Sequence, residues 1–303
     1  MLKTNNESEA METDYLTLAV ASGKGGTGKT TVATGLAQLL STSPVVLKDC
    51  DVEAPNTALF LKGEKISEKS HYVFVPEIDR DVCTACGACA KICQFKALVS
   101  IPGRIMKFPE LCHGCRGCIQ VCPTGAVIES RRHCGDITTY KRDNLTLVEG
   151  RLRIGEAMAP PLIEAVKALK PGNGEARLTL LDSPPGTSCP AITAIRDTDY
   201  VILVTEPTPF GLHDLSLAAD MVKALNLPAG VIVNRARPND EATRRRIAEM
   251  DLPILTELPD SRKAAEGMAR GELIINAMPE TRPLLKEAYT QILATLKREE
   301  AAQ

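Results

Sequence analysis

Tryptophan is absent from this chain of 303 residues, and aromatic residues make up only 3% of it. Proteins that hold single-stranded nucleic acid stack bases on aromatic side chains, so this scarcity argues against such a platform. The formal net charge of −2 favours neither nucleic acid nor an anionic membrane surface as a partner. No apolar run approaches the roughly 18 residues that span a bilayer. We therefore expect no nucleic-acid partner and no stable membrane insertion.

Cysteine, in contrast, is abundant, with eleven residues. Eight of them form two copies of the pattern C-x-x-C-x-x-C-x-x-x-C, placed 29 positions apart. A [4Fe–4S] cluster of this kind takes three thiolates from one tight loop and the fourth from the other half of the domain. We therefore predict two clusters with crossed ligation. The predicted ligands are Cys83, Cys86, Cys89 and Cys122 for the first cluster, and Cys93, Cys112, Cys115 and Cys118 for the second.

Two other uses of these cysteines remain as alternatives. Zinc is held by paired C-x-x-C knuckles, which would leave the third cysteine of each triplet unexplained. Disulfides require an oxidising compartment, whereas no signal peptide is recognisable and a reducing cytoplasm suits so many thiolates. Pro123 follows Cys122 as in the bacterial ferredoxin pattern, although Gln94 replaces that proline in the first copy.

The segment from Gly23 to Thr30 reads GKGGTGKT, a complete P-loop. It follows a predicted strand over 16–22 and opens a predicted helix over 29–41, which is the context that such a loop requires. Its glycines let successive N–H groups surround phosphate oxygens at a helix N-terminus. Lys29 then reaches the β- and γ-phosphates and the Thr30 hydroxyl binds Mg²⁺, so ATP and Mg²⁺ are the predicted ligands.

Short β-branched runs alternate with helical stretches along most of the chain, which predicts an α/β fold with a mostly parallel sheet and helices on both faces. We expect a disordered tail over 1–14, an ATPase domain over 15–76 and 131–303, and an inserted small α+β ferredoxin domain over 77–130. Each half of the insert is expected to carry a short helix, at 95–98 and at 124–127. Further strands are expected at 45–48, 178–182, 200–205, 230–234 and 254–258, and further helices at 212–225, 240–250, 260–270 and 282–298.

The additional lysine, Lys24, makes this P-loop resemble the deviant P-loop of the MinD/Mrp/ParA ATPases. Four later segments also resemble motifs of that family. The segment 49–56 is similar to its first switch, 182–187 to its second switch, 230–234 to its adenine-reading strand and 258–260 to the loop over the base. The resemblance covers about residues 15–275 and is to members that carry an inserted ferredoxin domain with two [4Fe–4S] clusters.

This resemblance implies a P-loop NTPase fold of the SIMIBI type and a dimer, either with a second copy or with a paralogue. It implies that Lys29 acts on its own nucleotide, Lys24 on the partner's, and that Asp51 orients the attacking water. Thr30 and Asp182 would organise Mg²⁺, and Asp49 would support the metal's water shell. The implied ATP contacts are Gly23, Lys24, Gly25, Gly26, Thr27, Gly28, Lys29, Thr30, Thr31, Asn234, Pro259 and Asp260.

Three cysteines lie outside the repeat. Cys50 and Cys134 are expected to be small buried residues, because free cysteine commonly packs as a hydrophobe. Cys189 lies seven residues after Asp182, the offset at which the nitrogenase iron protein places a cluster ligand, so we hypothesise an interface or redox role for it. The apolar stripe of the C-terminal helix is expected to pack on the core.

Two function classes follow from ATP and cluster binding together. The first is a Mg²⁺-dependent ATPase in which nucleotide-driven dimer closure gates electron transfer to a redox or metallocofactor-maturation partner. The second is an iron–sulfur assembly or carrier ATPase, or a redox-sensing positioning ATPase. Complete ligation by eight cysteines favours the first class, and no C-x-x-C follows Cys122 as a Mrp-like carrier would require.

Overall fold

The computed structural model describes residues 15–170 and 176–302, and its frame is a nine-stranded sheet of order β11-β10-β9-β1-β8-β2-β7-β6-β3. Neighbouring strands from β11 to β7 are all parallel, whereas β6 is antiparallel to both β7 and β3. The strands are β1 (Leu16–Ala21), β2 (Val45–Asp49), β3 (Glu64–Ile78), β6 (Val127–Arg142), β7 (Leu145–Leu152), β8 (Leu178–Asp182), β9 (Tyr200–Thr205), β10 (Ala229–Ala236) and β11 (Ile254–Pro259).

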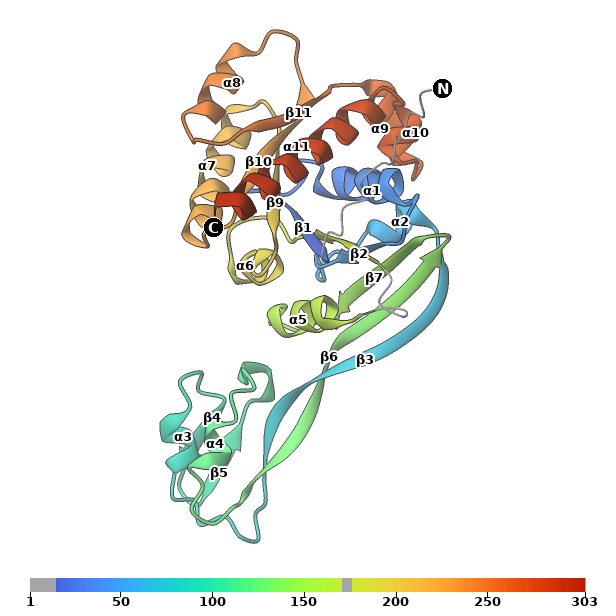
Figure 1. Ribbon diagram of the computed structural model, residues 1–303. Helices are drawn as coiled ribbons and strands as arrows, with labels where there is room; N and C mark the ends of the chain where they lie inside the picture. Colours follow the sequence, from blue (N-terminus) through green and yellow to red (C-terminus); the bar gives the residue numbers. More distant parts are fainter. Residues whose placement is uncertain (1–14, 171–175, 303) are drawn as a thin grey trace.

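Helices cover both faces of the parallel part, and each face has its own apolar core (Figure 1). One face packs against α1 (Lys29–Leu40), α2 (Thr57–Leu61), α9 (Arg262–Ala269), α10 (Ile274–Ala277) and α11 (Thr281–Ala302). The other packs against α5 (Pro160–Ala168), α6 (Cys189–Ile195), α7 (Pro209–Ala224) and α8 (Glu241–Ala248). Burial on both faces explains the nearly continuous apolar strands such as β9.

The predicted α/β class with a mostly parallel sheet is confirmed. The predicted packing of the C-terminal helix is confirmed as well, since Leu285, Ala288 and Ile292 of α11 are buried in the first core. Along the described residues, no helix is both long enough and apolar enough to cross a bilayer. The tail predicted over 1–14 lies outside the described residues.

Strands β3 and β6 form a long two-stranded ribbon that leaves the edge of the sheet (Figure 1). Their pairing runs from Glu64 opposite Lys141 to Ile78 opposite Val127. A small unit at the far end contains β4 (Leu98–Ile101), β5 (Arg104–Lys107), α3 (Ala88–Ile92), α4 (Gly117–Gln120) and the 3₁₀ turn η1 (Pro109–Leu111). The domain limits expected at 77 and 130 therefore fall inside two continuous strands.

The short helices expected at 95–98 and 124–127 are wrong. The helices begin seven residues earlier, as α3 and α4, and each includes the third cysteine of its triplet. Left-handed backbone at Lys96 (φ 56°) and Gly125 (φ 68°) is incompatible with a helix there. The chain then enters β4 at Leu98 and β6 at Val127.

Candidate functional site: a nucleotide cradle and two groups of thiols

The P-loop connects β1 to α1 at the carboxyl edge of the parallel strands. Gly28 has a φ of 99°, and a Cβ atom there would lie 2.2 Å from Asn234 Nδ2. Position 28 therefore needs glycine for two reasons: its backbone angle is left-handed, and the Asn234 side chain of β10 leaves no room for a Cβ atom. Lys29 is buried, and its Nζ donates a hydrogen bond to Ser22 Oγ over 3.0 Å.

The Thr30 hydroxyl donates a hydrogen bond of 2.6 Å to Asp182 Oδ2. Asp182 is buried at the end of β8, and in the described part of the chain its Oδ1 has no hydrogen-bond partner. Burial and the nearby charge of Asp49 hold the pKa of Asp182 well above its ordinary value, despite opposing contributions from Thr30 and Lys29. A buried carboxylate oxygen without a partner, beside a hydroxyl and a lysine, fits a Mg²⁺ site.

Asp49 anchors the loop that follows β2. Its Oδ1 accepts from Asp51 N (3.1 Å), and its Oδ2 accepts from Asn56 N (3.0 Å), Thr57 N (3.1 Å) and Thr57 Oγ1 (2.9 Å). Burial raises the pKa of Asp49 to about 7, although these hydrogen bonds oppose the shift. The anchored loop brings Asp51 near Lys29, and Lys29 partly offsets the increase in the pKa of Asp51 that burial causes.

Lys24 forms an ion pair with Glu206, which also binds Arg235 through Nη1 at 3.1 Å. Glu206 follows β9, the strand beside β1, so both side chains reach the same edge of the sheet. Our sequence reasoning missed Glu206. An acidic residue directly after a buried strand is a signal that could have identified it.

Of the other predicted nucleotide contacts, Asn234, Pro259 and Asp260 lie at or next to the ends of β10 and β11, and Thr31 lies in the first turn of α1. Asn234 Nδ2 donates to Thr27 O over 2.8 Å, and Asp260 N donates to Ala236 O over 3.1 Å, directly after Pro259. Thr31 Oγ1 faces Met268 Sδ at 3.9 Å. The fold thus brings the P-loop, both switch segments and the ends of β10 and β11 to one edge.

The cysteines of the insert lie in two groups. The first group lines one small cavity, together with Gly87, Ala88 and Pro123; its members are Cys83, Cys86, Cys89 and Cys122. The second group consists of Cys93, Cys112, Cys115 and Cys118, where Cys112 interacts with Cys115 and Cys93. In this second group, burial raises the pKa of Cys118 to about 11, and two neighbouring thiols raise it further.

Backbone N–H groups point at several of these sulfurs. Gly114 N donates to Cys112 Sγ over 3.5 Å. Burial acts to raise the pKa of Cys122, but N–H groups of Val127, Thr124 and Ala126 outweigh it, so the pKa is lowered. No three His, Cys, Asp or Glu side chains among the described residues converge on a single-ion site. Thiols that surround a volume and receive N–H groups fit a polynuclear iron–sulfur cluster better than one zinc ion.

The two groups occupy different levels of the ribbon. Cys112 Sγ in the second group lies 3.7 Å from Phe74 O. The cavity of the first group is closed by Ile78 and Val127, at the far end of the β3–β6 pairing. The second group is therefore nearer to the large sheet.

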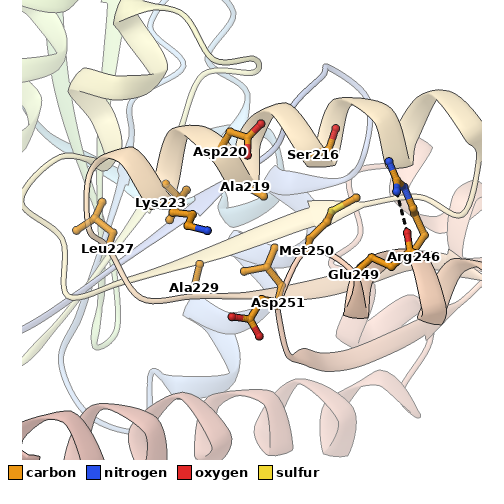
Figure 2. Close-up of a pocket in the computed structure, with 12 residues that line it drawn as sticks. Ser216, Ala219, Asp220, Lys223, Leu227, Ala229, Arg246, Glu249, Met250 and Asp251 are labelled. Atoms are coloured by element: carbon orange, nitrogen blue, oxygen red, sulfur yellow. Dashed lines mark hydrogen bonds and ion pairs between the residues drawn. The ribbon is translucent and has the colours of Figure 1, made fainter.

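The three other cysteines differ in exposure. Cys50 and Cys134 are fully buried in the core beneath α5, as expected for small apolar residues, and burial raises the pKa of both thiols. Cys189 is exposed and is the first residue of α6, beyond the second switch segment. A separate cavity between α7 and α8 (Figure 2) includes none of the predicted nucleotide or cluster residues in its lining.

A P-loop whose threonine is hydrogen-bonded to a buried aspartate, at the carboxyl edge of a parallel sheet, is the site of a nucleotide-binding P-loop protein. Residues 18–274 match the family described as CbiA, the CobQ/CobB/MinD/ParA nucleotide binding domain, and the chain belongs to that family.

An uncharacterized protein of Methanocaldococcus jannaschii is 34% identical over 235 residues, which cover 75% of this chain and 82% of that protein. The iron-sulfur cluster carrier protein of Aquifex aeolicus is 26% identical over 283 residues, covering 87% of this chain and 63% of the carrier. Among solved structures, the septum site-determining protein MinD of Pyrococcus horikoshii, in complex with Mg-ADP, is 20% identical. It superposes with a TM-score of 0.54 over 90% of this chain and 94% of its own.

Proposed function

We propose that this protein is a Mg²⁺-dependent ATPase that couples nucleotide-driven dimer closure to electron transfer through two [4Fe–4S] clusters. The observation that carries the proposal is the grouping of eight thiols into the two crossed sets, on a ribbon continuous with the nucleotide-binding sheet. The client is a protein that takes part in metallocofactor or iron–sulfur maturation. The reducing cytoplasm is the compartment that suits these thiols.

On the nucleotide side, each role follows from a position in the site. Lys29 and the P-loop N–H groups hold the phosphates, and Thr30 with Asp182 holds Mg²⁺. Asp51 orients the attacking water, and Asp49 keeps the Asp51 loop in place through four hydrogen bonds. When two protomers close, Lys24 leaves its ion pair with Glu206 and contacts the nucleotide of the partner.

On the insert side, two clusters would supply one-electron storage at two levels of the ribbon. The chain's own contribution is to bury the thiols and to aim N–H groups at them, which sets how readily each cluster accepts an electron. A homodimer or a heterodimer with a paralogue would bring two ribbons to the same partner. Cys189, exposed beside the second switch segment, is proposed to face that dimer interface.

A second candidate function is an iron–sulfur cluster carrier, and similarity to the Aquifex aeolicus carrier favours it. A carrier must release its cluster, whereas four cysteine ligands per cluster hold it firmly. A positioning ATPase that uses the clusters only as a redox sensor is the third candidate.

The test is an anaerobic redox titration followed by EPR, with ADP and then with a non-hydrolysable ATP analogue. Gated electron transfer predicts a nucleotide-dependent shift in midpoint potential, since allosteric couplings of about 1–3 kcal/mol are typical. Lys29→Ala is the control that should abolish the shift while the iron content stays unchanged. Midpoints that ignore nucleotide in a fully loaded protein would favour the carrier or sensor instead.

A further inference from the structure

Arg132 is a charged residue buried between the insert and the sheet. It lies on β6 opposite Val73, two residues before the buried Cys134. Only 9% of its side chain is exposed, and it forms an ion pair with Glu156, whose side chain is 0% exposed. Within the described residues, Arg132 Nε and Nη2 are buried without a hydrogen-bond partner.

Glu156 does not neutralise this site completely, because it serves two cations. Arg153 Nη2 lies 3.7 Å from the same Oε2 atom, and Met158 N donates to Oε1 over 3.2 Å. Glu156 belongs to the segment between β7 and α5, on the nucleotide-binding side of the molecule. Two arginines therefore share one carboxylate at the place where the β3–β6 ribbon joins the rest of the large sheet, which leaves an excess of positive charge.

Arg132 lies beside the second group of cysteines. It pairs with Val73, and the carbonyl oxygen of the next residue, Phe74, lies 3.7 Å from Cys112 Sγ. The cations beside the first group are placed differently: Arg80, Arg104 and Lys107 line a groove next to Cys83 and are all exposed. Water and salt screen exposed charges far more than buried ones.

We propose that Arg132 is a positioning residue for electron transfer, which makes the second cysteine group the preferred resting place of an electron. This inference rests on the proposed function. Positive charge and N–H donors near the sulfurs favour the reduced form of an iron–sulfur cluster. A one-electron donor protein is oxidised by one electron at the tip of the ribbon, and that electron then comes to rest at the level nearer the sheet. No proton or other atom is transferred.

The experiment is EPR-monitored anaerobic redox titration of the full-length holoprotein and four variants. Arg132→Gln should lower the higher of the two midpoint potentials by a tenfold change in the reduction equilibrium, or about 59 mV for one electron. Glu156→Gln removes the compensating carboxylate and should shift the same step in the opposite direction. Arg132→Lys keeps the charge and should stay near wild type. Arg131→Gln, an exposed neighbour on the opposite face, is the matched control.

The inference is overturned if Arg132→Gln and Arg131→Gln titrate alike at full iron content, or if only the lower midpoint moves. Should Arg132→Gln lose its iron, Glu156→Gln and Arg132→Lys decide the question: the higher midpoint must rise in the first and stay near wild type in the second. A wild-type protein that binds no iron–sulfur cluster would instead overturn the proposed function itself.

Discussion

Thr30 and Asp182 are joined by a hydrogen bond of 2.6 Å between the hydroxyl on the first turn of α1 and the carboxylate at the end of β8. The two residues are 152 positions apart in sequence, and adjacent parallel strands bring them together. The bond holds both ligands of the predicted Mg²⁺ site in place before the metal arrives. Such preorganisation reduces the cost of binding.

Thr30→Ala should bind nucleotide without productive Mg²⁺ coordination. Loss of about 3 kcal/mol of metal stabilisation corresponds to roughly a 100-fold decrease in kcat. Thr34→Ala is the control, because the Thr34 hydroxyl bonds the carbonyls of Thr30 and Thr31 within the same helix. Steady-state phosphate release measures both variants. Equal rates for Thr30→Ala and Thr34→Ala would remove Thr30 from the metal site.

Lys24→Ala should hydrolyse ATP at least roughly 100-fold more slowly, since a cation supplied by a partner contributes strongly to phosphoryl transfer. Nucleotide affinity at low protein concentration should change little. Arg235→Ala, which removes the other cation of Glu206, should retain hydrolysis. Rates measured against protein concentration test this directly. A Lys24→Ala variant that remains fully active would exclude action across a dimer.

Mg²⁺ binding should strengthen as the pH rises. Burial raises the pKa of Asp49 to about 7 and raises the pKa of Asp182 as well, so protons compete with Mg²⁺ for this site as the pH falls. Mg²⁺ requires carboxylates, and its binding must therefore expel those protons. Calorimetry with Mg²⁺ and ADP at pH 6, in buffers of different ionisation enthalpy, should show proton release that fades above about pH 8. Asp49→Asn should reduce the release, whereas a pH-independent affinity would contradict the prediction.

Crossed ligation predicts which cysteines share a cluster. Cys122→Ala and Cys83→Ala should remove the same EPR signal and leave the other intact, although the two residues belong to different repeats. Cys93→Ala and Cys112→Ala should both remove the other EPR signal. Cys134→Ala is the control, because that thiol packs in the core, where it donates a hydrogen bond of 3.9 Å to Met158 O. Loss of signals in sequence order, with Cys93 grouped with Cys83, would exclude the crossed arrangement.

Gly135→Ala should destabilise the base of the ribbon. An added Cβ would lie 2.4 Å from Arg151 O and 2.7 Å from Leu162 Cδ2. Overpacking of this kind costs about 1–3 kcal/mol. Gly25→Ala, whose methyl group meets nothing within 4 Å, serves as the control. Anaerobic thermal unfolding followed by circular dichroism compares them, and equal midpoints would show that the base of the ribbon yields easily.

The predicted nucleotide site, at the carboxyl edge of the parallel strands, could be located from the sequence because its motifs are local and its strands are apolar on both faces. Glycine spacing identifies the P-loop, and the order of buried strands places Asp182 and Asn234 beside it. Glu206 escaped prediction because its importance depends on a pairing with Lys24 across two adjacent strands. Its place directly after a buried strand is a local signal, but that signal does not identify Lys24 as its partner.

The ribbon could not be predicted for a physical reason. The first part of β3, EKISEKSHY, is polar and largely exposed, so it shows no alternation between a buried and an exposed face. Its partner strand follows almost fifty residues later, and the intervening cysteine repeats suggested a compact boundary instead. The positions of helices α3 and α4 were predicted wrongly for a related reason. Left-handed Gly87 and Arg116 start each helix inside the cysteine loop itself.

The stretch of β6 from Val127 to Cys134 pairs only with β3, because pairing with β7 begins at Gly135. These eight residues form a beam about 27 Å long, at roughly 3.4 Å per residue. Pivoting that beam by about 10° at its fixed end carries the tip sideways by about 5 Å, given the same rise per residue. A small change of angle at the base of the ribbon would therefore displace the cysteine groups by several ångströms without altering the P-loop.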